Sequence, residues 1–158
     1  MLFLASIFLG IVPMVVYAAI VWRLDRWEKE PLPLLMAAFL WGSIPAVIFA
    51  IIAQGVLDIP HQGNPEEASL LFHLYQASFV APVTEEILKG LGLLLLFRTF
   101  QREIDSVLDG LIYGSMIGFG FSAVENVLYF FGQGDPLGLL ALCFLRAFVF
   151  GMLHALFT

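Results

Sequence analysis

Apolar runs long enough to cross a lipid bilayer constrain this sequence more than any other feature. Of its 158 residues, 61% are hydrophobic and only 13% are charged, whereas about a quarter of the residues in a soluble domain are charged. A helix needs about 20 apolar residues to cross about 30 Å of hydrocarbon. The sequence therefore predicts an all-α, polytopic transmembrane helical bundle.

Polar segments divide the chain into about five predicted spans. The spans are expected at residues 1–21, 34–57, 82–97, 107–131 and 137–158. We expect Pro45 to bend the second span. Residues 69–97 are too long for one upright span, so we expect Pro82 to divide them. The part before Pro82 is then an interfacial or re-entrant segment, and the part after it is the third span.

The basic residues lie in alternate loops and predict the orientation of the spans. The loop at residues 22–31 holds three of the seven basic residues, and the loop at 98–102 holds two more. The loops at 58–68 and 132–136 hold none. Because basic loops stay on the cytoplasmic side, we expect the N-terminus to lie outside and the basic loops to lie in the cytoplasm.

Three charged side chains interrupt the apolar run of the third span, namely Glu85, Glu86 and Lys89. In hydrocarbon each charge costs from about 3 to more than 10 kcal/mol, so such residues need partners or a purpose. On a helix Lys89 lies three residues from Glu86 and four from Glu85, so it can pair with either. Two interpretations follow: a structural ion pair that locks the bundle, or a carboxylate site for acid/base chemistry.

The fourth span combines a stripe of small residues with a further acid. The small residues recur every four positions and are Gly110, Gly114, Gly118 and Ser122. Such a stripe lets another helix approach closely. Asn126 continues the stripe and Glu125 lies beside it. We therefore expect Glu125 to face the bundle interior.

Helix rise predicts where the acids meet. If the third span begins at Pro82, Glu85 and Glu86 lie one turn inside its outer end, and Glu125 lies about two turns inside the outer end of the fourth span. The three acids would then meet in the outer third of the membrane. Counting from the last turn puts His154 nearer the inner side, which fits that meeting point less well.

The fifth apolar run adds two more candidates. Arg146 needs an acidic or headgroup partner in the membrane. Together with the acids, His154 could activate a water directly or could help to hold a divalent metal. Zinc is the preferred metal, with Glu86, Glu125 and His154 as its ligands. The sequence has no HExxH motif, so the common zincin arrangement is excluded.

Two function classes are disfavoured by composition. Seven basic residues scattered singly do not favour nucleic-acid binding. The one cysteine, Cys143, excludes a disulfide framework, and we expect it to be a small buried apolar residue.

Taken in order, these motifs resemble the PrsW family of intramembrane proteases, which is related to the CAAX prenyl proteases and to bacteriocin-processing membrane proteases. The matching segments are the acidic, proline-ended loop 25–31, the EExxK motif in 81–90, the segments 109–114 and 118–129, and Arg146 followed by His154-Ala155-Leu156.

The resemblance implies an intramembrane endopeptidase. Its substrate would be a membrane-anchored protein, such as an anti-sigma factor, cut near the outer side of a prokaryotic plasma membrane. The implied catalytic residues are Glu85, Glu86, Glu125 and His154, supported by Lys89, Asn126 and Arg146. One of the paired glutamates would activate the water, and both a metalloprotease and a glutamate-dependent enzyme stay open. The alternative is a non-catalytic membrane module, a scaffold or a cation-binding or transport component, that uses the same polar network.

We expect residues 1–158 to form a single membrane-embedded, protease-like domain. Family members continue through further spans with another histidine motif, whereas this chain ends four residues after His154. We therefore expect the domain to be truncated at its C-terminus and its activity to be incomplete. The expected partners are the lipid bilayer and a membrane-anchored protein substrate, and the sequence does not predict an oligomeric state.

Overall fold

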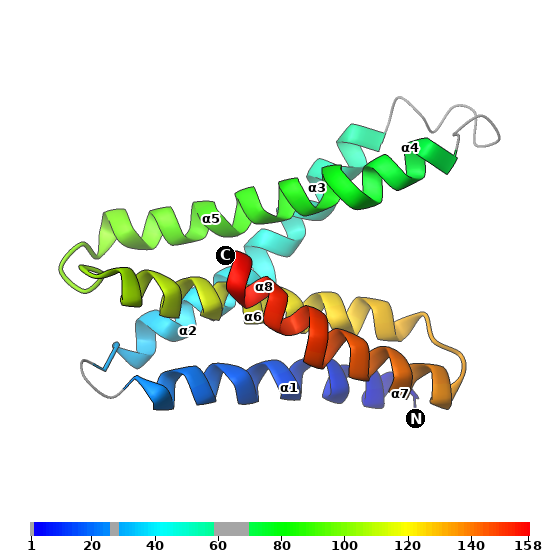
Figure 1. Cartoon of the computed structure of the whole chain (residues 1–158), viewed down its shortest axis with the longest axis horizontal. Coiled ribbons are helices and arrows are strands. Elements are labelled where there is room, and N and C mark those ends of the chain that lie inside the picture. Colours follow the sequence, from blue (N-terminus) through cyan, green and yellow to red (C-terminus); the bar gives the residue numbers. More distant parts are fainter. Residues whose placement is uncertain (1, 26–28, 59–69) are drawn as a thin grey trace.

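A computed structural model of the chain describes residues 2–25, 29–58 and 70–158, and these contain helices but no strands. The α-helices are α1 (Leu2–Leu24), α2 (Leu32–Trp41), α3 (Val47–Asp58), α4 (Leu70–Tyr75), α5 (Ala81–Thr99), α6 (Val107–Phe131), α7 (Pro136–Phe144) and α8 (Gly151–Phe157). Three π-helical segments lie between them: η1 (Gly42–Ala46), η3 (Gln76–Val80) and η4 (Leu145–Phe150). Figure 1 shows the helices assembled into one elongated bundle. The prediction of an all-α helical bundle is confirmed.

Within the described residues, four helical segments are long and apolar enough to cross a membrane. They are Leu2–Leu24, Leu32–Leu57, Val107–Phe131 and Pro136–Phe157. Their outward faces carry large exposed apolar side chains, such as Leu4 at 69% and Phe144 at 62% exposure. Such faces suit contact with lipid rather than water. The second of these segments contains Pro45 inside η1, at the position where a bend was expected.

Pro82 does not divide the third apolar run. The segments α4, η3 and α5 follow one another without interruption, and they form the long green rod in Figure 1. In η3 the Ala81 N–H donates to the Gln76 carbonyl, which is the longer i→i+5 bond of a π turn. Pro82 then falls in the first turn of α5, where its missing N–H costs little. The predicted separate segment before Pro82 is therefore wrong.

The helix α6 occupies the centre of the bundle. In its most apolar stretch 61% of the residues are buried, compared with 17% in α1. It packs against α1, α2, η1, α5 and α8. The helix begins with a capping box, in which the Ser106 side chain accepts from the Asp109 N–H and the Asp109 side chain accepts from the Ser106 N–H. Every other helix of the functional site is positioned against α6.

Glycines let two helices touch the backbone of α6. A Cβ placed on Gly120 would lie 2.0 Å from the Phe39 carbonyl oxygen, and one on Gly42 would lie 2.0 Å from the Ile117 carbonyl oxygen. These two contacts seat α2 and η1 on one face of α6.

On another face of α6, the small-residue stripe receives α8. A Cβ on Gly118 would lie 2.5 Å from the His154 carbonyl oxygen, and one on Gly114 would lie 3.0 Å from the Thr158 carbonyl carbon. The predicted close approach of a helix to this stripe is confirmed, except at Gly110, where nothing lies within 4 Å.

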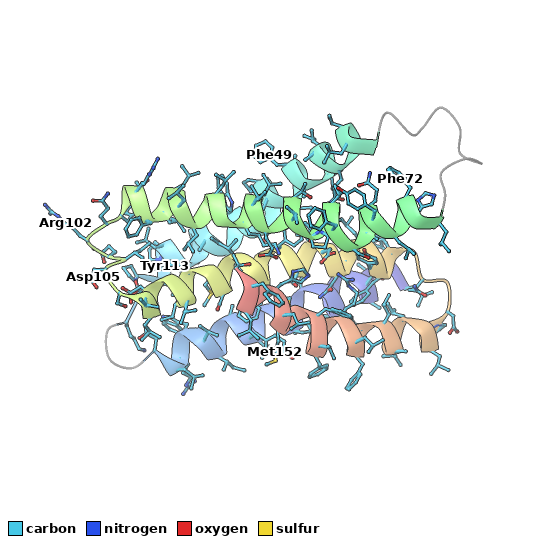
Figure 2. The ribbon with its side chains drawn as sticks, turned by 45° about the horizontal axis from the view of Figure 1, so that its top comes forward. Phe49, Phe72, Arg102, Asp105, Tyr113 and Met152 are labelled. Atoms are coloured by element: carbon cyan, nitrogen blue, oxygen red, sulfur yellow. The ribbon has the colours of Figure 1, made fainter. Side chains whose placement is uncertain are left out.

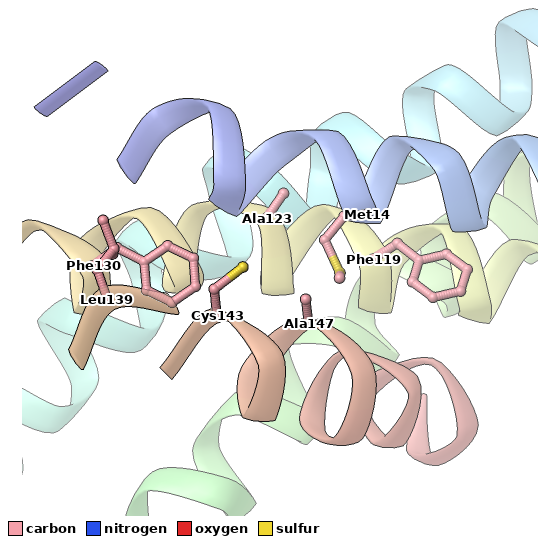
Figure 3. Close-up of a cluster of buried hydrophobic side chains, with 7 residues drawn as sticks. All are labelled: Met14, Phe119, Ala123, Phe130, Leu139, Cys143 and Ala147. Atoms are coloured by element: carbon pink, nitrogen blue, oxygen red, sulfur yellow. The ribbon is translucent and has the colours of Figure 1, made fainter. Parts of the chain in front are cut away.

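Apolar side chains hold the outer helices to α6. One buried cluster joins α1, α6, α7 and η4, and Figure 3 shows its members: Met14, Phe119, Ala123, Phe130, Leu139, Cys143 and Ala147. The Cys143 side chain is 8% exposed within this cluster. Its prediction as a small buried apolar residue is confirmed.

A buried polar cluster ties the first loop to the beginning of α6. The Tyr113 hydroxyl donates to Glu30 Oε2 over 2.6 Å, and the Glu30 N–H donates to Asp25 Oδ2 over 3.1 Å. Burial raises the pKa of the Glu30 carboxyl to about 7, and the nearby Asp109 and Asp25 act in the same direction while the Tyr113 hydrogen bond opposes it. Figure 2 shows Tyr113 near Asp105, at the end of the bundle that carries the 100–106 loop.

Candidate active site

Four charged or ionisable side chains from three helices meet in the interior of the bundle. Glu86 and Lys89 come from α5, Glu125 from α6 and His154 from α8. The Lys89 ammonium pairs with Glu86 Oε1 and lies 3.0 Å from His154 Nδ1. His154 Nε2 lies 3.2 Å from Glu125 Oε2. We call these four residues the charged chain, because each one contacts the next.

Lys89 is the most enclosed member of the charged chain, with 0% of its side chain exposed. An ammonium group has three donors. Two are directed at Glu86 and His154, and the third side of the group faces the Phe121 ring, whose centroid lies 4.5 Å from Nζ. The ring attracts the cation through its π face. The donors of the Lys89 ammonium therefore all have partners, although water does not reach this side chain.

Arg146 closes the other end of the charged chain. Its Nη2 lies 2.7 Å from Glu125 Oε2, its Nε donates to Asn126 Oδ1 over 3.0 Å, and its guanidinium lies 3.8 Å from the centroid of the Tyr129 ring. The predicted need of Arg146 for an acidic partner is met by Glu125. The guanidinium thereby fixes the Glu125 carboxylate in place.

Glu85 lies beside the charged chain and hydrogen-bonds to a different helix. The Gln54 side-chain amide of α3 donates to Glu85 Oε1 over 3.3 Å. Next to this hydrogen bond is a pocket of about 580 Å³, whose polar lining residues are Gln54, His73, Gln76 and Tyr129. The two neighbouring glutamates thus have separate surroundings, since Glu86 pairs with Lys89 and Glu85 accepts from Gln54 of α3.

Glu85 and Glu86 lie farther from the start of their helical segment than predicted. Because the helical segment begins at Leu70, Glu86 lies about 24 Å from that end at about 1.5 Å per residue, and not one turn inside it. The prediction that placed Glu85 and Glu86 in the first turn of a span is therefore wrong.

His154 reaches the acids although its own helix crosses α6 at Gly118. Gly118 lies about two turns from Glu125. The Glu125 side chain spans the remaining distance to the imidazole. The predicted mismatch in depth between Glu125 and His154 is overcome by the length of the carboxylate side chain and by the close helix crossing.

Three further residues of the site were not anticipated from the sequence. They are Gln54, Phe121 and Thr158, whose hydroxyl lies 3.3 Å from Glu86 Oε2. Gln54 could have been found, because it is the one polar side chain in the apolar stretch 47–57. Phe121 lies in the segment 118–129 that carries the family resemblance, but nothing distinguished its side chain from the other phenylalanines among the 16 in the chain.

The charged chain as arranged does not fit a metal ion. Among the described residues, no three His, Cys, Asp or Glu side chains form a group that could hold one. The atoms that would coordinate a cation already face cationic side chains, because Glu86 Oε1 and His154 Nδ1 face Lys89 while Glu125 Oε2 faces Arg146. Zinc at Glu86, Glu125 and His154 therefore stays a prediction, and no step of the chemistry below depends on it.

Relatives of the chain are found among curated proteins. It is 28% identical to protease PrsW of Bacillus subtilis over 131 residues, which cover 82% of this chain and 56% of that protein. It is likewise 28% identical to protease PrsW of Clostridioides difficile, over 83% of this chain and 52% of that protein. The chain thus spans a little over half the length of these relatives. No solved structure matches it.

The sequence pattern of one protein family matches most of the chain. That family is described as the PrsW family intramembrane metalloprotease, and the match covers residues 30–158. This region contains every member of the charged chain, together with Arg146 and Asn126. From this match over most of its length, and from the relatives that share it, the chain belongs to the PrsW family of intramembrane proteases.

Proposed function

We propose that this chain carries the catalytic carboxylates of an intramembrane endopeptidase, with Glu86 as the general base. The observation that supports this proposal is the charged chain itself, which brings two acids, a lysine and a histidine from three helices into contact within the bundle. Buried charges of this kind are costly in a membrane and mark functional sites.

Glu86 is the carboxylate best placed to activate a water. Its Oε1 is bound by Lys89, whereas its Oε2 faces the Thr158 hydroxyl and the side chain is 34% exposed. Oε2 can therefore accept a proton from a water while Lys89 holds the carboxylate in position and keeps it ionised. The resulting hydroxide attacks the scissile carbonyl, and the proton passes from Glu86 to the leaving amine.

Asn126 is the proposed donor to the oxyanion. Its Oδ1 accepts from Arg146, while its Nδ2 is buried and has no hydrogen-bond partner among the described residues. A fixed amide N–H in a site that excludes water stabilises developing negative charge strongly. In this proposal Arg146 positions both Asn126 and Glu125.

The proposed substrate is a membrane-anchored protein, such as an anti-sigma factor, cut near the outer side of a prokaryotic plasma membrane. Support comes from the family and from relatives in Bacillus subtilis and Clostridioides difficile. The alternating basic loops support an N-terminus outside the cell and basic loops in the cytoplasm. Incubation with a chelator, followed by metal analysis and a cleavage assay, tests whether zinc takes part.

The substitution Glu86→Gln tests the proposal directly. It keeps the size of the side chain and removes the base, so cleavage of a membrane-anchored substrate should fall to background at normal abundance of the protein. Glu103→Gln is the matched control, because Glu103 is exposed in the 100–106 loop and its substitution should leave cleavage unchanged. Unchanged cleavage by the Glu86 variant would remove Glu86 from the mechanism.

A non-catalytic module is the second candidate, and one observation favours it. Both acids of the charged chain are paired with cations, Glu86 with Lys89 and Glu125 with Arg146, as expected of a network that only locks helices together. In that case Glu86→Gln and Glu125→Gln would lower abundance and thermal stability, with a partial loss of function that follows the loss of protein. Loss of cleavage in a fully stable variant excludes this candidate.

A further inference from the structure

We propose that Lys89 selects the tautomer of His154, so that the imidazole carries its one N–H on Nε2, the ring nitrogen on the side of Glu125. Lys89 is then a positioning residue that acts through His154. The tautomer follows from the geometry of the charged chain alone, whereas its consequence for catalysis rests on the proposed function.

The lysine side of the ring requires an accepting nitrogen. An ammonium group donates hydrogen bonds and accepts none. Because Lys89 Nζ lies 3.0 Å from His154 Nδ1 and also pairs with the Glu86 carboxylate, it is a charged donor at this position. A proton on Nδ1 would point at the ammonium at hydrogen-bond distance. The neutral ring with a bare Nδ1 is therefore the form that fits.

Lys89 cannot easily turn away from this contact. Its side chain is completely buried, and its remaining neighbours are the Glu86 carboxylate and the face of the Phe121 ring. The ammonium thus has three donors and three partners, of which His154 Nδ1 is one. Releasing His154 would leave one donor unsatisfied away from water, which costs about 1–3 kcal/mol or more for a charged group.

The opposite side of the ring suits a donating nitrogen. His154 Nε2 lies 3.2 Å from Glu125 Oε2, and the same oxygen lies 2.7 Å from the Arg146 guanidinium. A carboxylate paired with arginine is ionised and only accepts hydrogen bonds. Glu125 Oε2 has no hydrogen-bond partner among the described residues, so Glu125 attracts a proton on Nε2 through its charge without fixing it. The contact with Lys89 is therefore the one that selects the tautomer, and Glu125 is compatible with it.

This tautomer divides the chemical roles within the proposed site. With Nδ1 occupied by Lys89 and Nε2 protonated, His154 is an N–H donor and not the base that accepts the proton of the water. That role is left to Glu86. When a peptide carbonyl enters, the Nε2–H can turn from Glu125 to the developing oxyanion without any change in protonation.

The test is the nitrogen NMR spectrum of His154 in the full chain, held in detergent micelles at neutral pH after treatment with a chelator. Histidine is labelled with ¹⁵N in its ring, and the His154 signals are those lost in His154→Gln. We expect a pyrrole-like Nε2 and a pyridine-like Nδ1. Lys89→Arg, which keeps a charged donor, should retain this pattern. Lys89→Met should lose the pyridine-like Nδ1, because Glu86 Oε1 lies 3.9 Å from Nδ1 and favours a proton there once the ammonium is gone.

Tyr113→Phe is the control, because it removes a buried hydrogen bond at a distance from His154 and should leave the His154 signals unchanged. A proton on Nδ1 in the unsubstituted protein would overturn the proposal, and so would an unchanged tautomer in Lys89→Met. If Lys89→Met does not fold, the spectra of the unsubstituted protein and of Lys89→Arg still decide. Since the spectrum requires no cleavage, an inactive protein with the Nε2–H tautomer would contradict the proposed function and not this inference.

Discussion

Arg146 shows how a single side chain can govern several neighbours inside this bundle. Its guanidinium contacts the Glu125 carboxylate, the Asn126 amide and the Tyr129 ring at the same time. Arginine suits such a place because it remains charged and presents its donors in a fixed plane. The position of Glu125, and through it that of His154, depends on this residue.

Replacing Arg146 by alanine should destabilise the protein strongly. The change leaves the Glu125 carboxylate without its cationic partner in a buried place, and breaking a buried pair in this way costs about 3–5 kcal/mol. Arg146→Lys keeps the charge but loses the planar contacts, so its cost should be smaller. Denaturant unfolding in detergent measures the stability of both variants. Arg102→Ala is the control, because Arg102 is exposed and its loss should have little effect on stability.

Contacts between near neighbours could be predicted from the sequence, whereas contacts between distant residues could not. The pairing of Lys89 with Glu86 follows from their spacing on one helix. The contact between Lys89 and His154 joins residues 65 positions apart and depends on how α8 crosses α6. No local pattern encodes that crossing, so the partner of His154 stayed open until the helices were placed.

At the scale of helices, the close crossing of α2 and α6 depends on the absence of one methyl group. A Cβ on Gly120 would lie 2.0 Å from the Phe39 carbonyl oxygen, which belongs to the backbone and cannot rotate away. Gly120→Ala should therefore push the two helices apart and destabilise the protein by about 1–3 kcal/mol.

Gly110→Ala is the matched control on the same helix. Nothing lies within 4 Å of a Cβ at Gly110, and alanine favours helix over glycine by up to about 1 kcal/mol. In thermal unfolding, Gly120→Ala should therefore lower the unfolding temperature and Gly110→Ala should raise it. Equal stability of Gly120→Ala and the unsubstituted protein would show that the helices do not meet this closely.

The continuous helix through Pro82 shows why the predicted break failed. The general rule that proline ends a helix holds for regular α-helix, where the ring clashes with the preceding turn. Here the π turn of η3 comes directly before Pro82 and changes the hydrogen-bond pattern of that turn. A π turn has no recognised sequence pattern of its own, so the run at residues 70–99 could only be divided by the general rule.

At the scale of the whole molecule, Glu30 joins the loop between the first two helices to the centre of the bundle. Its carboxyl is 5% exposed and accepts from Tyr113 of α6, with Asp25 and Asp109 nearby. The pKa of Glu30 is raised to about 7. A carboxyl with a raised pKa stabilises the folded protein at low pH, and that stability is lost as the pH rises through the folded-state value.

The free energy of unfolding should therefore fall as the pH rises from about 5 to about 8, because the Glu30 carboxyl ionises within the cluster. Glu30→Gln removes the titration and should flatten this part of the stability profile. Glu103→Gln, at an exposed acid, should leave the profile as it is. A profile that is already flat in the unsubstituted protein, or equally steep in Glu30→Gln, would contradict a titration at Glu30.

Four of the five predicted spans match helical segments that are long and apolar enough to cross a membrane, because hydrophobic length is a property of local stretches. The predicted third span at residues 82–97, which carries Glu85, Glu86 and Lys89, is not among these segments. The central position of α6 was only partly predictable. Its small-residue stripe indicated a close neighbour, but the stripe did not identify the neighbour as α8 or reveal the second contact through Gly42. Which helices meet is decided by the fit of many surfaces at once, and that fit is not encoded in a single segment.

The π turn η4 has a consequence for counting residues. His154 follows Arg146 by eight positions, which on a regular α-helix separates their directions by about 80° at about 100° per residue. One extra residue in a π turn shifts the later part by about 100° in the opposite sense, and brings both side chains to the face that meets Glu125.

Deleting Val149 should remove the extra residue and turn η4 into regular α-helix. Seven steps of about 100° from Arg146 to His154 then leave the two side chains within about 20° of each other, so both should still face Glu125. Cleavage and the His154 ring signals should therefore be kept, whereas inserting one alanine after Val149 should rotate His154 by about 100° away from Glu125 and abolish cleavage. A relative with one residue fewer between the arginine and the histidine could thus have the same site on a helix without a π turn.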